Sequence, residues 1–268
     1  MASPIPPSEQ KADHVREMFG RIARNYDLMN RLMTLGRDQT WRRYSVSQAL
    51  QPSHSPRGQG RLGHPGDPLA APGDGKWVLD VATGTGDLAL DVLRQDPSLH
   101  VVGVDFVPQM LAMAQQKTTG AVQGTSSGEK ASRLALTAGD ALHLPFVDSW
   151  FDAVVTGFAL RNVTDIPAAF AEMARVTRTG GRIACLEIAK PRLPVFRRLF
   201  ALYFYRLVPL LGEWIVGEHV AYTYLPHSLT AFLTPDQIAD VMRRTGWCEV
   251  SHQRLMMGSV AVHVGTRA

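Results

Sequence analysis

The sequence predicts an α/β fold in which a mainly parallel sheet ends in an antiparallel hairpin. Apolar runs of strand length alternate with helical patterns between residues 77 and 188, and repeated βα units of this kind build a parallel sheet with right-handed crossovers. Two strand patterns, 247–253 and 258–266, follow the last helix with a tight turn at Met257-Gly258 between them. A connection this short allows no crossover, so the last strand should insert antiparallel.

This alternation predicts seven strands and four helices between them. The expected strands are 77–82, 100–104, 133–137, 152–156, 182–188, 247–253 and 258–266, and the expected helices are 86–94, 108–117, 165–177 and 235–245. Continuous apolar runs are typical of buried parallel strands. A loop rich in Gly, Ser and Thr is expected over 119–130.

Other segments flank this core. Apolar residues recur at helical spacing from Asp13, which can act as an N-cap, to Met33, so residues 1–50 should form a tail and a helical arm. Residues 51–75 are rich in Pro, Gly, Ser and His and should be a flexible linker. The main domain is expected over 76–268, with 191–234 inserted as a helical cover over the carboxyl edge of the sheet.

Composition excludes several classes of protein. The 268 residues, 45% of them hydrophobic, suffice for one α/β domain with small additions. The net charge of +4 comes without the basic runs of a nucleic-acid binder and suits an anionic membrane surface. Cys185 and Cys248 show no disulfide or metal spacing and are expected to be buried, reduced thiols. The first residues have neither the basic start nor the apolar core of a signal peptide, so a cytoplasmic protein is expected.

A glycine-rich loop follows the first expected strand, in Trp77-Val-Leu-Asp-Val-Ala-Thr-Gly-Thr-Gly-Asp87. Gly84 and Gly86 can take positive φ and let a ligand approach the backbone, and the next helix points its free N–H groups at the same place. Asp105 ends the second strand, where a carboxylate can accept both hydroxyls of a ribose. The loop therefore predicts a nucleoside ligand.

Acidic residues indicate which nucleoside binds. Gly84-Thr-Gly-Asp-Leu-Ala89 also fits the dinucleotide pattern, but Asp80 and Asp87 would repel a pyrophosphate and would attract the ammonium of an amino-acid moiety. This favours S-adenosylmethionine over NAD, and a class I methyltransferase fold over a dehydrogenase fold. A nicotinamide dehydrogenase is the alternative class, and a strand-turn-helix without ligand is the structural alternative.

Two further strand ends carry candidate site residues. Asp140 can accept the amino group of an adenine, and the backbone of Ala141 can serve its ring nitrogens. Thr156-Gly-Phe-Ala-Leu-Arg-Asn-Val163 ends the fourth strand, at the carboxyl edge where open sheets bind ligands. Arg161 is the strong cation at this edge, and a surface or ion-pair arginine is the alternative interpretation.

Four motifs connect the chain to a known family: Tyr26-Asp-Leu-Met-Asn30, Leu79-Asp-Val-Ala-Thr-Gly-Thr-Gly-Asp87, Leu160-Arg-Asn-Val-Thr-Asp165 and Leu186-Glu-Ile-Ala-Lys-Pro191. Through them the chain resembles the ubiquinone/menaquinone-biosynthesis C-methyltransferase (UbiE) family from about residue 11 to its end, apart from 51–75 and 119–130. The resemblance implies methylation of an isoprenoid quinol, with demethylmenaquinol as the main expectation and a benzoquinol as the alternative. It also implies that Thr85, Asp105, Asp140, Ala141 and Gly157 bind S-adenosylmethionine. Thr83 stands where many relatives have glycine, and Gly157 where some have serine.

The predicted site residues fall into three groups. The cofactor is expected to bind at Asp80, Thr83, Gly84, Thr85, Gly86, Asp87, Asp105, Phe106, Asp140, Ala141 and Gly157. The substrate is expected to bind at Phe158, Asn162, Glu187, His219 and Tyr222. Catalysis is assigned to Arg161, which would stabilise the quinol oxyanion, with Asp27 and Tyr26. Asp27, Tyr26, His219 and Glu187 stay open as proton acceptors, and no carboxylate cluster has the spacing of a metal site.

The segment before the last helix predicts the remaining partners. The segment 195–225 is apolar, aromatic and basic, but it is interrupted by Arg197, Arg198, Arg206, Pro209 and Glu213, so it should not span a bilayer. An apolar cover suits a lipophilic ring substrate and loose, peripheral membrane binding. A cover that only shields the sheet, a non-catalytic scaffold for quinone biosynthesis and a homo-oligomer are left open. Nucleic acid is not an expected partner.

Overall fold

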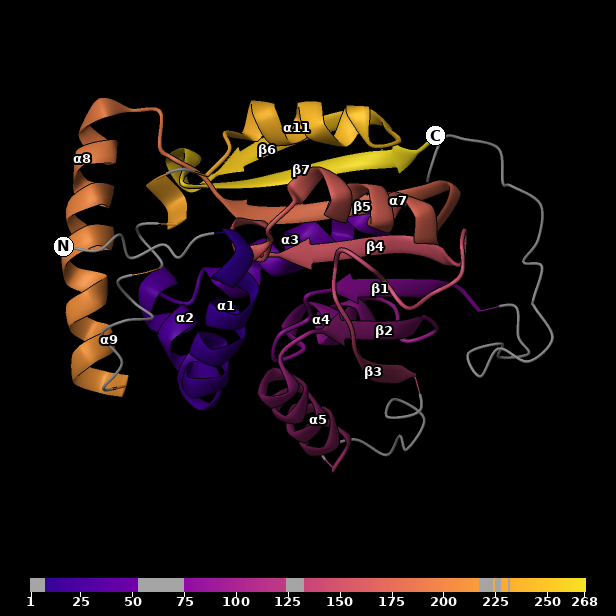
Figure 1. Cartoon of the computed structure of the whole chain (residues 1–268), viewed down its shortest axis with the longest axis horizontal. Helices are drawn as coiled ribbons and strands as arrows, with labels where there is room; N and C mark the ends of the chain where they lie inside the picture. Colours follow the sequence, from indigo (N-terminus) through magenta and orange to yellow (C-terminus); the bar gives the residue numbers. More distant parts are fainter. Residues whose placement is uncertain (1–7, 53–74, 124–132, 217–223, 225–227, 231) are drawn as a thin grey trace.

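The computed structural model describes residues 8–52, 75–123, 133–216, 224, 228–230 and 232–268. Within these residues the chain forms a seven-stranded sheet in the order β3-β2-β1-β4-β5-β7-β6 (Figure 1). The strands are β1 (Trp77–Val81), β2 (His100–Asp105), β3 (Leu134–Ala138), β4 (Phe151–Gly157), β5 (Thr177–Ile188), β6 (Trp247–Leu255) and β7 (Val260–Arg267).

Strands β1 to β5 run parallel, and β7 returns antiparallel between β5 and β6. All five residues of β1 are buried, as expected of a strand covered on both faces. The turn between β6 and β7 is the short helix η4 (Met256–Gly258), where Met257 and Gly258 have φ of 51° and 89°. The predicted parallel sheet with an antiparallel terminal hairpin is confirmed.

Helices cover both faces of this sheet. On one face lie α3 (Asp38–Ala49) and α4 (Asp87–Gln95), and on the other lie α7 (Ile166–Val176) and α11 (Pro235–Arg244). Helix α5 (Pro108–Gln123) packs against β2 and β3. Side chains fix two helix starts: Asp165 accepts a hydrogen bond from the Ala168 N–H, and Thr234 forms a capping box with Gln237.

Two helical layers lie beyond the carboxyl ends of the parallel strands (Figure 1). The inner layer is the N-terminal arm, made of α1 (Ser8–Ile22), η1 (Ala23–Asn25) and α2 (Tyr26–Thr34). The outer layer is a rod made of α8 (Pro194–Leu202), η3 (Tyr203–Leu207) and α9 (Val208–Val216). Both layers contribute to one apolar cluster, through residues such as Met18, Met29, Phe204 and Val208. The arm therefore packs between the strands and the predicted cover.

Several sequence-based expectations need correction. Helix α1 begins at Ser8, so Asp13 is not its N-cap. Helix α5 runs to Gln123, into the loop that was expected from residue 119. Strand β5 begins at Thr177 rather than at 182. Thr177 pairs with Phe151 of β4 and Arg182 pairs with Ala153, and β5 continues through Gly180 and Gly181 between these two pairs.

The expectation that both cysteines are buried is wrong for Cys248, which is exposed on the edge strand β6, while Cys185 is buried. The predicted linker 51–75 falls almost wholly outside the described residues, and so does the part 124–130 of the predicted loop. In the described part of the chain, no helix combines the length and the apolarity that crossing a bilayer requires.

Candidate functional site

The glycine loop joins β1 to α4 with an unusual backbone. Gly84 and Gly86 have φ of 56° and 83°, and Ala82, directly after β1, has φ of 55°. A Cβ atom on Gly84 would meet nothing within 4 Å, whereas one on Gly86 would lie 3.2 Å from the Cβ of Ala114. Gly84 thus leaves bare backbone open to a ligand, and Gly86 allows the close approach of α5.

Asp105 connects this loop to the end of β2. Its Oδ2 accepts a hydrogen bond of 2.8 Å from the Gly84 N–H, and its Oδ1 accepts one of 2.9 Å from the Val107 N–H. Burial raises the pKa of the carboxyl group, although these backbone N–H groups oppose the shift. Each oxygen keeps a lone pair, so the carboxylate can hold the loop and still accept from a ligand hydroxyl.

Asp80 lies beneath the loop. Its Oδ2 accepts from the Thr83 hydroxyl at 2.6 Å and from the Ala89 N–H at 3.0 Å, and its Oδ1 is buried without a partner. Burial raises the pKa of Asp80 to about 7, against the two hydrogen bonds. Thr83 therefore stabilises a buried carboxyl group through its hydroxyl.

A pocket of about 130 Å³ opens between these strand ends and the arm. Six of the predicted cofactor residues line it: Gly84, Asp105, Phe106, Asp140, Ala141 and Gly157. Its other wall comes from the arm, through Val15, Arg16, Phe19 and Tyr26. The other five predicted cofactor residues, Asp80, Thr83, Thr85, Gly86 and Asp87, are not among the lining residues and lie in or under the loop.

The turn after β4 carries the next group of predicted residues. Phe158 has φ of 58°, and the turn continues into the short helix η2 (Leu160–Asn162). Asn162 lines the first pocket, and its Oδ1 is buried without a partner. A positive φ is costly for a residue with a Cβ atom, so strain at this site is consistent with a functional turn.

Arg161 forms a buried ion pair with Glu187 of β5. Its side chain is only 4% exposed, and its Nη1 lies 3.5 Å from Glu187 Oε2. Glu187 Oε1 also accepts a hydrogen bond of 2.7 Å from the Leu160 N–H. Burial raises the pKa of Glu187, and the charge of Arg161 opposes that shift. Glu187, predicted to contact the substrate, lies under the turn and lines none of the described pockets.

A second, apolar pocket of about 280 Å³ adjoins the first, and Phe158 lines both. Arg161 lies in its wall, and the Nε atom of that guanidinium is buried without a partner. Most of the remaining lining is apolar, from α2, the rod and the β7 end of the sheet: Met33, Leu35, Phe196, Leu199, Phe200, Tyr203, Phe204, Met256 and Val260. A buried cation thus faces a space suited to an apolar ring.

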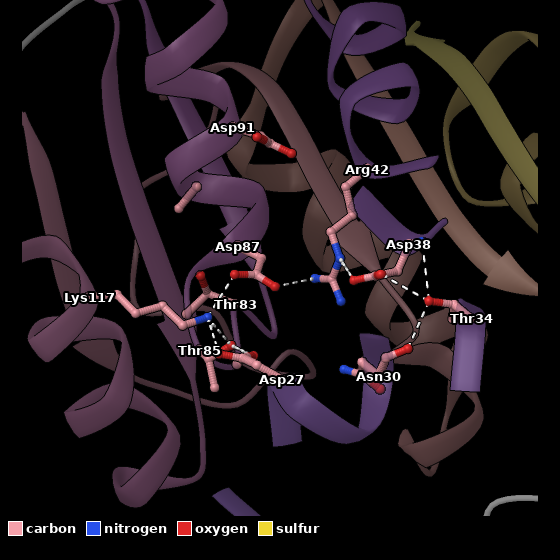
Figure 2. Close-up of polar contacts among 12 residues, drawn as sticks. Asp27, Asn30, Thr34, Asp38, Arg42, Thr83, Thr85, Asp87, Asp91 and Lys117 are labelled. Atoms are coloured by element: carbon pink, nitrogen blue, oxygen red, sulfur yellow. Dashed lines mark hydrogen bonds and ion pairs between the residues drawn. The ribbon is translucent and has the colours of Figure 1, made fainter. Parts of the chain in front are cut away.

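The two predicted catalytic residues of the arm, Tyr26 and Asp27, have different surroundings. Tyr26 lines the first pocket, and its ring packs edge-on against Phe19 with centroids 5.8 Å apart. Asp27 lines neither pocket, because its carboxylate accepts from the Thr85 hydroxyl at 2.6 Å and pairs with Lys117 at 2.5 Å (Figure 2). His219 and Tyr222 lie outside the described residues.

Asp87 is also paired within the protein. Its Oδ1 lies 2.7 Å from Lys117 Nζ, and its Oδ2 lies 3.6 Å from Arg42 Nη1 (Figure 2). Lys117 and Arg42 were not predicted as site residues, and no local pattern marks either of them, since they meet Asp87 only in the folded chain. Among the described residues, no group of three or more His, Cys, Asp or Glu side chains is arranged to hold a metal ion.

The sheet order, the glycine loop and the pocket at the carboxyl edge define a protein of the class I methyltransferase fold. The solved structure of an S-adenosylmethionine-dependent methyltransferase from Thermotoga maritima superposes on the chain with a TM-score of 0.58 at 15% identity, over 94% of this chain and 100% of the other. Likeness at this level concerns the fold alone.

Sequence comparison is more specific. The ubiE/COQ5 methyltransferase family matches residues 7–267. A demethylmenaquinone methyltransferase from Roseiflexus castenholzii is 42% identical, over 98% of this chain and 97% of the relative. A ubiquinone/menaquinone biosynthesis C-methyltransferase UbiE from a Geobacter species is 37% identical, over 96% and 98%. The chain belongs to the ubiE/COQ5 methyltransferase family, which confirms the resemblance inferred from its four motifs.

Proposed function

We propose that this protein transfers the methyl group of S-adenosylmethionine to a ring carbon of an isoprenoid quinol, with demethylmenaquinol as its substrate. The names of the relatives support this substrate. The observation that carries the proposal is the junction of two pockets at Phe158, with the buried Arg161 in the wall of the apolar one. A benzoquinol ring of the ubiquinone branch is the alternative acceptor.

The residues of the first pocket fit S-adenosylmethionine. Asp105 keeps acceptor capacity on both oxygens for two ribose hydroxyls. Asp140 and Ala141 line the same pocket and would form hydrogen bonds with the adenine. The unpartnered Oδ1 of Asn162 is a further acceptor in the same pocket, and a buried acceptor without a partner is costly until a donor arrives. When bound, S-adenosylmethionine supplies an electrophilic methyl group on its sulfonium.

The second pocket would position the quinol ring beside that methyl group. Loss of a phenolic proton makes the neighbouring ring carbon nucleophilic, and the N–H groups of Arg161 would stabilise the resulting phenolate. The guanidinium is suited to this because it contacts Glu187 at 3.5 Å through Nη1 and leaves Nε unpartnered. After the carbon–carbon bond forms, the hydrogen on that ring carbon leaves as a proton and the aromatic ring is restored.

Incubation of the purified protein with labelled S-adenosylmethionine and, in parallel, demethylmenaquinol and a demethoxy-benzoquinol tests the proposal. Label should enter the naphthoquinol, in a product whose new carbon–carbon bond resists acid and base. Label found only in the benzoquinol would favour the alternative acceptor. Cofactor binding without transfer to either ring would favour the non-catalytic scaffold.

We further infer that the protein binds peripherally to an anionic membrane, where an isoprenoid quinol resides. The outer face of the rod exposes large apolar side chains, including Val195, Leu199 and Leu202, beside Arg197 and Arg198. Leu199 also lines the apolar pocket. A surface with apolar side chains next to arginines binds anionic lipid interfaces, so the substrate could pass from the bilayer into the pocket.

A further inference from the structure

Lys117 extends from α5 to a point between the N-terminal arm and the glycine loop (Figure 2). Its Nζ lies 2.5 Å from Asp27 Oδ2 and 2.7 Å from Asp87 Oδ1, and it donates to the Thr85 hydroxyl at 2.8 Å. The side chain is 24% exposed. The three protons of an ammonium thus have three acceptors, two of them carboxylates from different elements.

Arg42 extends this network toward α3. Its Nη1 lies 3.6 Å from Asp87 Oδ2, and its Nε lies 3.6 Å from Asp38 Oδ2. The Thr34 hydroxyl, at the end of α2, lies 2.9 Å from Asp38 Oδ1. Burial alone would raise the pKa of Asp87, but Arg42 and Lys117 together lower it. The two cations therefore hold Asp87 ionised and connect the arm to the glycine loop at two points.

The network lies directly behind the cofactor pocket. Tyr26 of the arm and Gly84 of the glycine loop both line that pocket, and the next residue along the chain in each case, Asp27 and Thr85, contacts Lys117. One ammonium therefore holds the arm side and the sheet side of the pocket together. Without it, the Asp27 and Asp87 carboxylates would face each other with no cation between them, which is destabilising in a partly buried site.

We propose that Lys117 is a positioning residue that closes the N-terminal arm over the cofactor pocket by binding Asp27, Thr85 and Asp87 together. The inference rests on the proposed function only for the identity of the ligand, S-adenosylmethionine. Within the described part of the chain, Lys117 contacts Asp27, Thr85 and Asp87, none of which lines the pocket, so it acts on the ligand through the walls that it joins.

The test compares Lys117→Met, which keeps an unbranched side chain one atom shorter and without its charge, with Lys117→Arg and with Lys76→Met as the matched control. Lys76 is exposed at the opposite end of β1. Lys117→Met should bind S-adenosylmethionine about 5- to 150-fold more weakly by calorimetry, the usual range for energetically coupled sites. KM for the cofactor should rise in proportion while kcat at saturating cofactor stays within about twofold. Lys117→Arg should recover part of the affinity, and Lys76→Met should match the wild type.

Hydrogen exchange without any ligand separates this inference from the proposed function. Amides of residues 23–34 should exchange faster in Lys117→Met than in the wild type, whether or not the protein binds S-adenosylmethionine. In a double-mutant cycle, Asp27→Asn should weaken cofactor binding in the wild-type background and have a much smaller effect in Lys117→Met. Unchanged affinity and unchanged arm exchange in Lys117→Met would overturn the inference. A wild type that binds no S-adenosylmethionine would overturn the proposed function instead.

Discussion

The guanidinium of Arg161 compensates the buried charge of Glu187 and also lies in the wall of the apolar pocket. Arg161→Lys keeps a positive charge for Glu187 but loses the planar array of N–H groups. If Arg161 stabilises the quinol oxyanion, this variant should lose about 10²- to 10³-fold in kcat, with little change in the Kd for S-adenosylmethionine. Turnover and calorimetry on one preparation measure both quantities.

Arg161→Ala gives a second measurement at the same position. It should lose kcat to a similar extent, and it should also unfold at lower temperature, because an unpaired buried carboxylate costs about 3–5 kcal/mol. Glu187→Gln is the control, since it keeps an acceptor for the Leu160 N–H. Near-wild-type kcat per folded molecule in Arg161→Ala would reduce Arg161 to a structural ion-pair partner.

Asp105 provides a test of the cofactor site. Asp105→Ala should weaken S-adenosylmethionine binding by about 1–3 kcal/mol, because ribose hydroxyls lose a charged acceptor. Part of this loss should come from the glycine loop, since the same carboxylate accepts from the Gly84 and Val107 N–H groups. Asp105→Asn, which keeps one acceptor oxygen, should have an affinity for S-adenosylmethionine between those of the wild type and Asp105→Ala. Equal affinities in all three folded proteins would remove Asp105 from the site.

At the scale of elements, the junction of β1 with α4 contains a carboxyl group whose burial opposes ionisation. Asp80 has an ordinary pKa of 3.8 and a folded-state pKa of about 7. Between these values the folded protein keeps a proton that the unfolded chain has lost, so stability should fall as pH rises from about 4 to about 7. Each pKa unit corresponds to about 1.4 kcal/mol, so the change is on the order of a few kcal/mol.

Thermal unfolding across this pH range tests the expectation with Asp80→Asn. The amide cannot ionise, so the decline of Tm with rising pH should become shallower. Part of the decline should remain, because the pKa values of Glu187 and Asp105 are also raised. Asp240→Asn, at an exposed position of α11, is the control and should keep the wild-type slope. An unaltered slope in Asp80→Asn would show that Asp80 is ionised in the folded protein at pH 4.

The elements that could be predicted from sequence are those with a strong local pattern. Strands β1, β2 and β4 are predominantly apolar runs, and their ends were placed within one residue. The start of α1 was misplaced because Ser8, Glu9 and Gln10 precede any apolar repeat, so the first turn carries no amphipathic signal. The exposure of Cys248 depends on β6 being the edge strand, which is a property of the sheet order.

The residues of the site also differ in whether a local sequence pattern predicts them. Gly84, Asp105 and Asp140 were found because each lies at or just after the carboxyl end of a parallel strand. The contacts of Asp27 and Asp87 with Lys117 join residues that are 30 or more positions apart on three elements, and no spacing along the chain indicates such a contact. The pairing of Glu187 with Arg161 was likewise hidden, since a glutamate at the end of a strand can point to a ligand or to the protein.

At the scale of the whole molecule, the apolar pocket shares exposed apolar residues with the surface of the rod, the arm and the β6–β7 turn. Three residues that line the pocket are themselves exposed, namely Leu35 at 82%, Leu199 at 59% and Met256 at 41%. They come from the arm, the rod and the β6–β7 turn, so three distant parts of the chain surround the opening. An opening rimmed by apolar side chains is expected to face the lipid phase when the protein binds a membrane.

Vesicle flotation tests this orientation. The wild type should float with phosphatidylglycerol-containing vesicles at low salt and less at high salt, because arginines near the apolar rim attract anionic lipid through interactions that salt screens. Leu199→Glu and Leu202→Glu place a carboxylate on the exposed face of α8 and should reduce flotation severalfold, with Tm unchanged. Val147→Glu adds the same charge at an apolar residue in the turn before β4 that is 38% exposed, and it should float like the wild type. If the wild type fails to float at either salt concentration, the quinol must reach the pocket by another route; if all three variants float equally, the membrane contacts a different face.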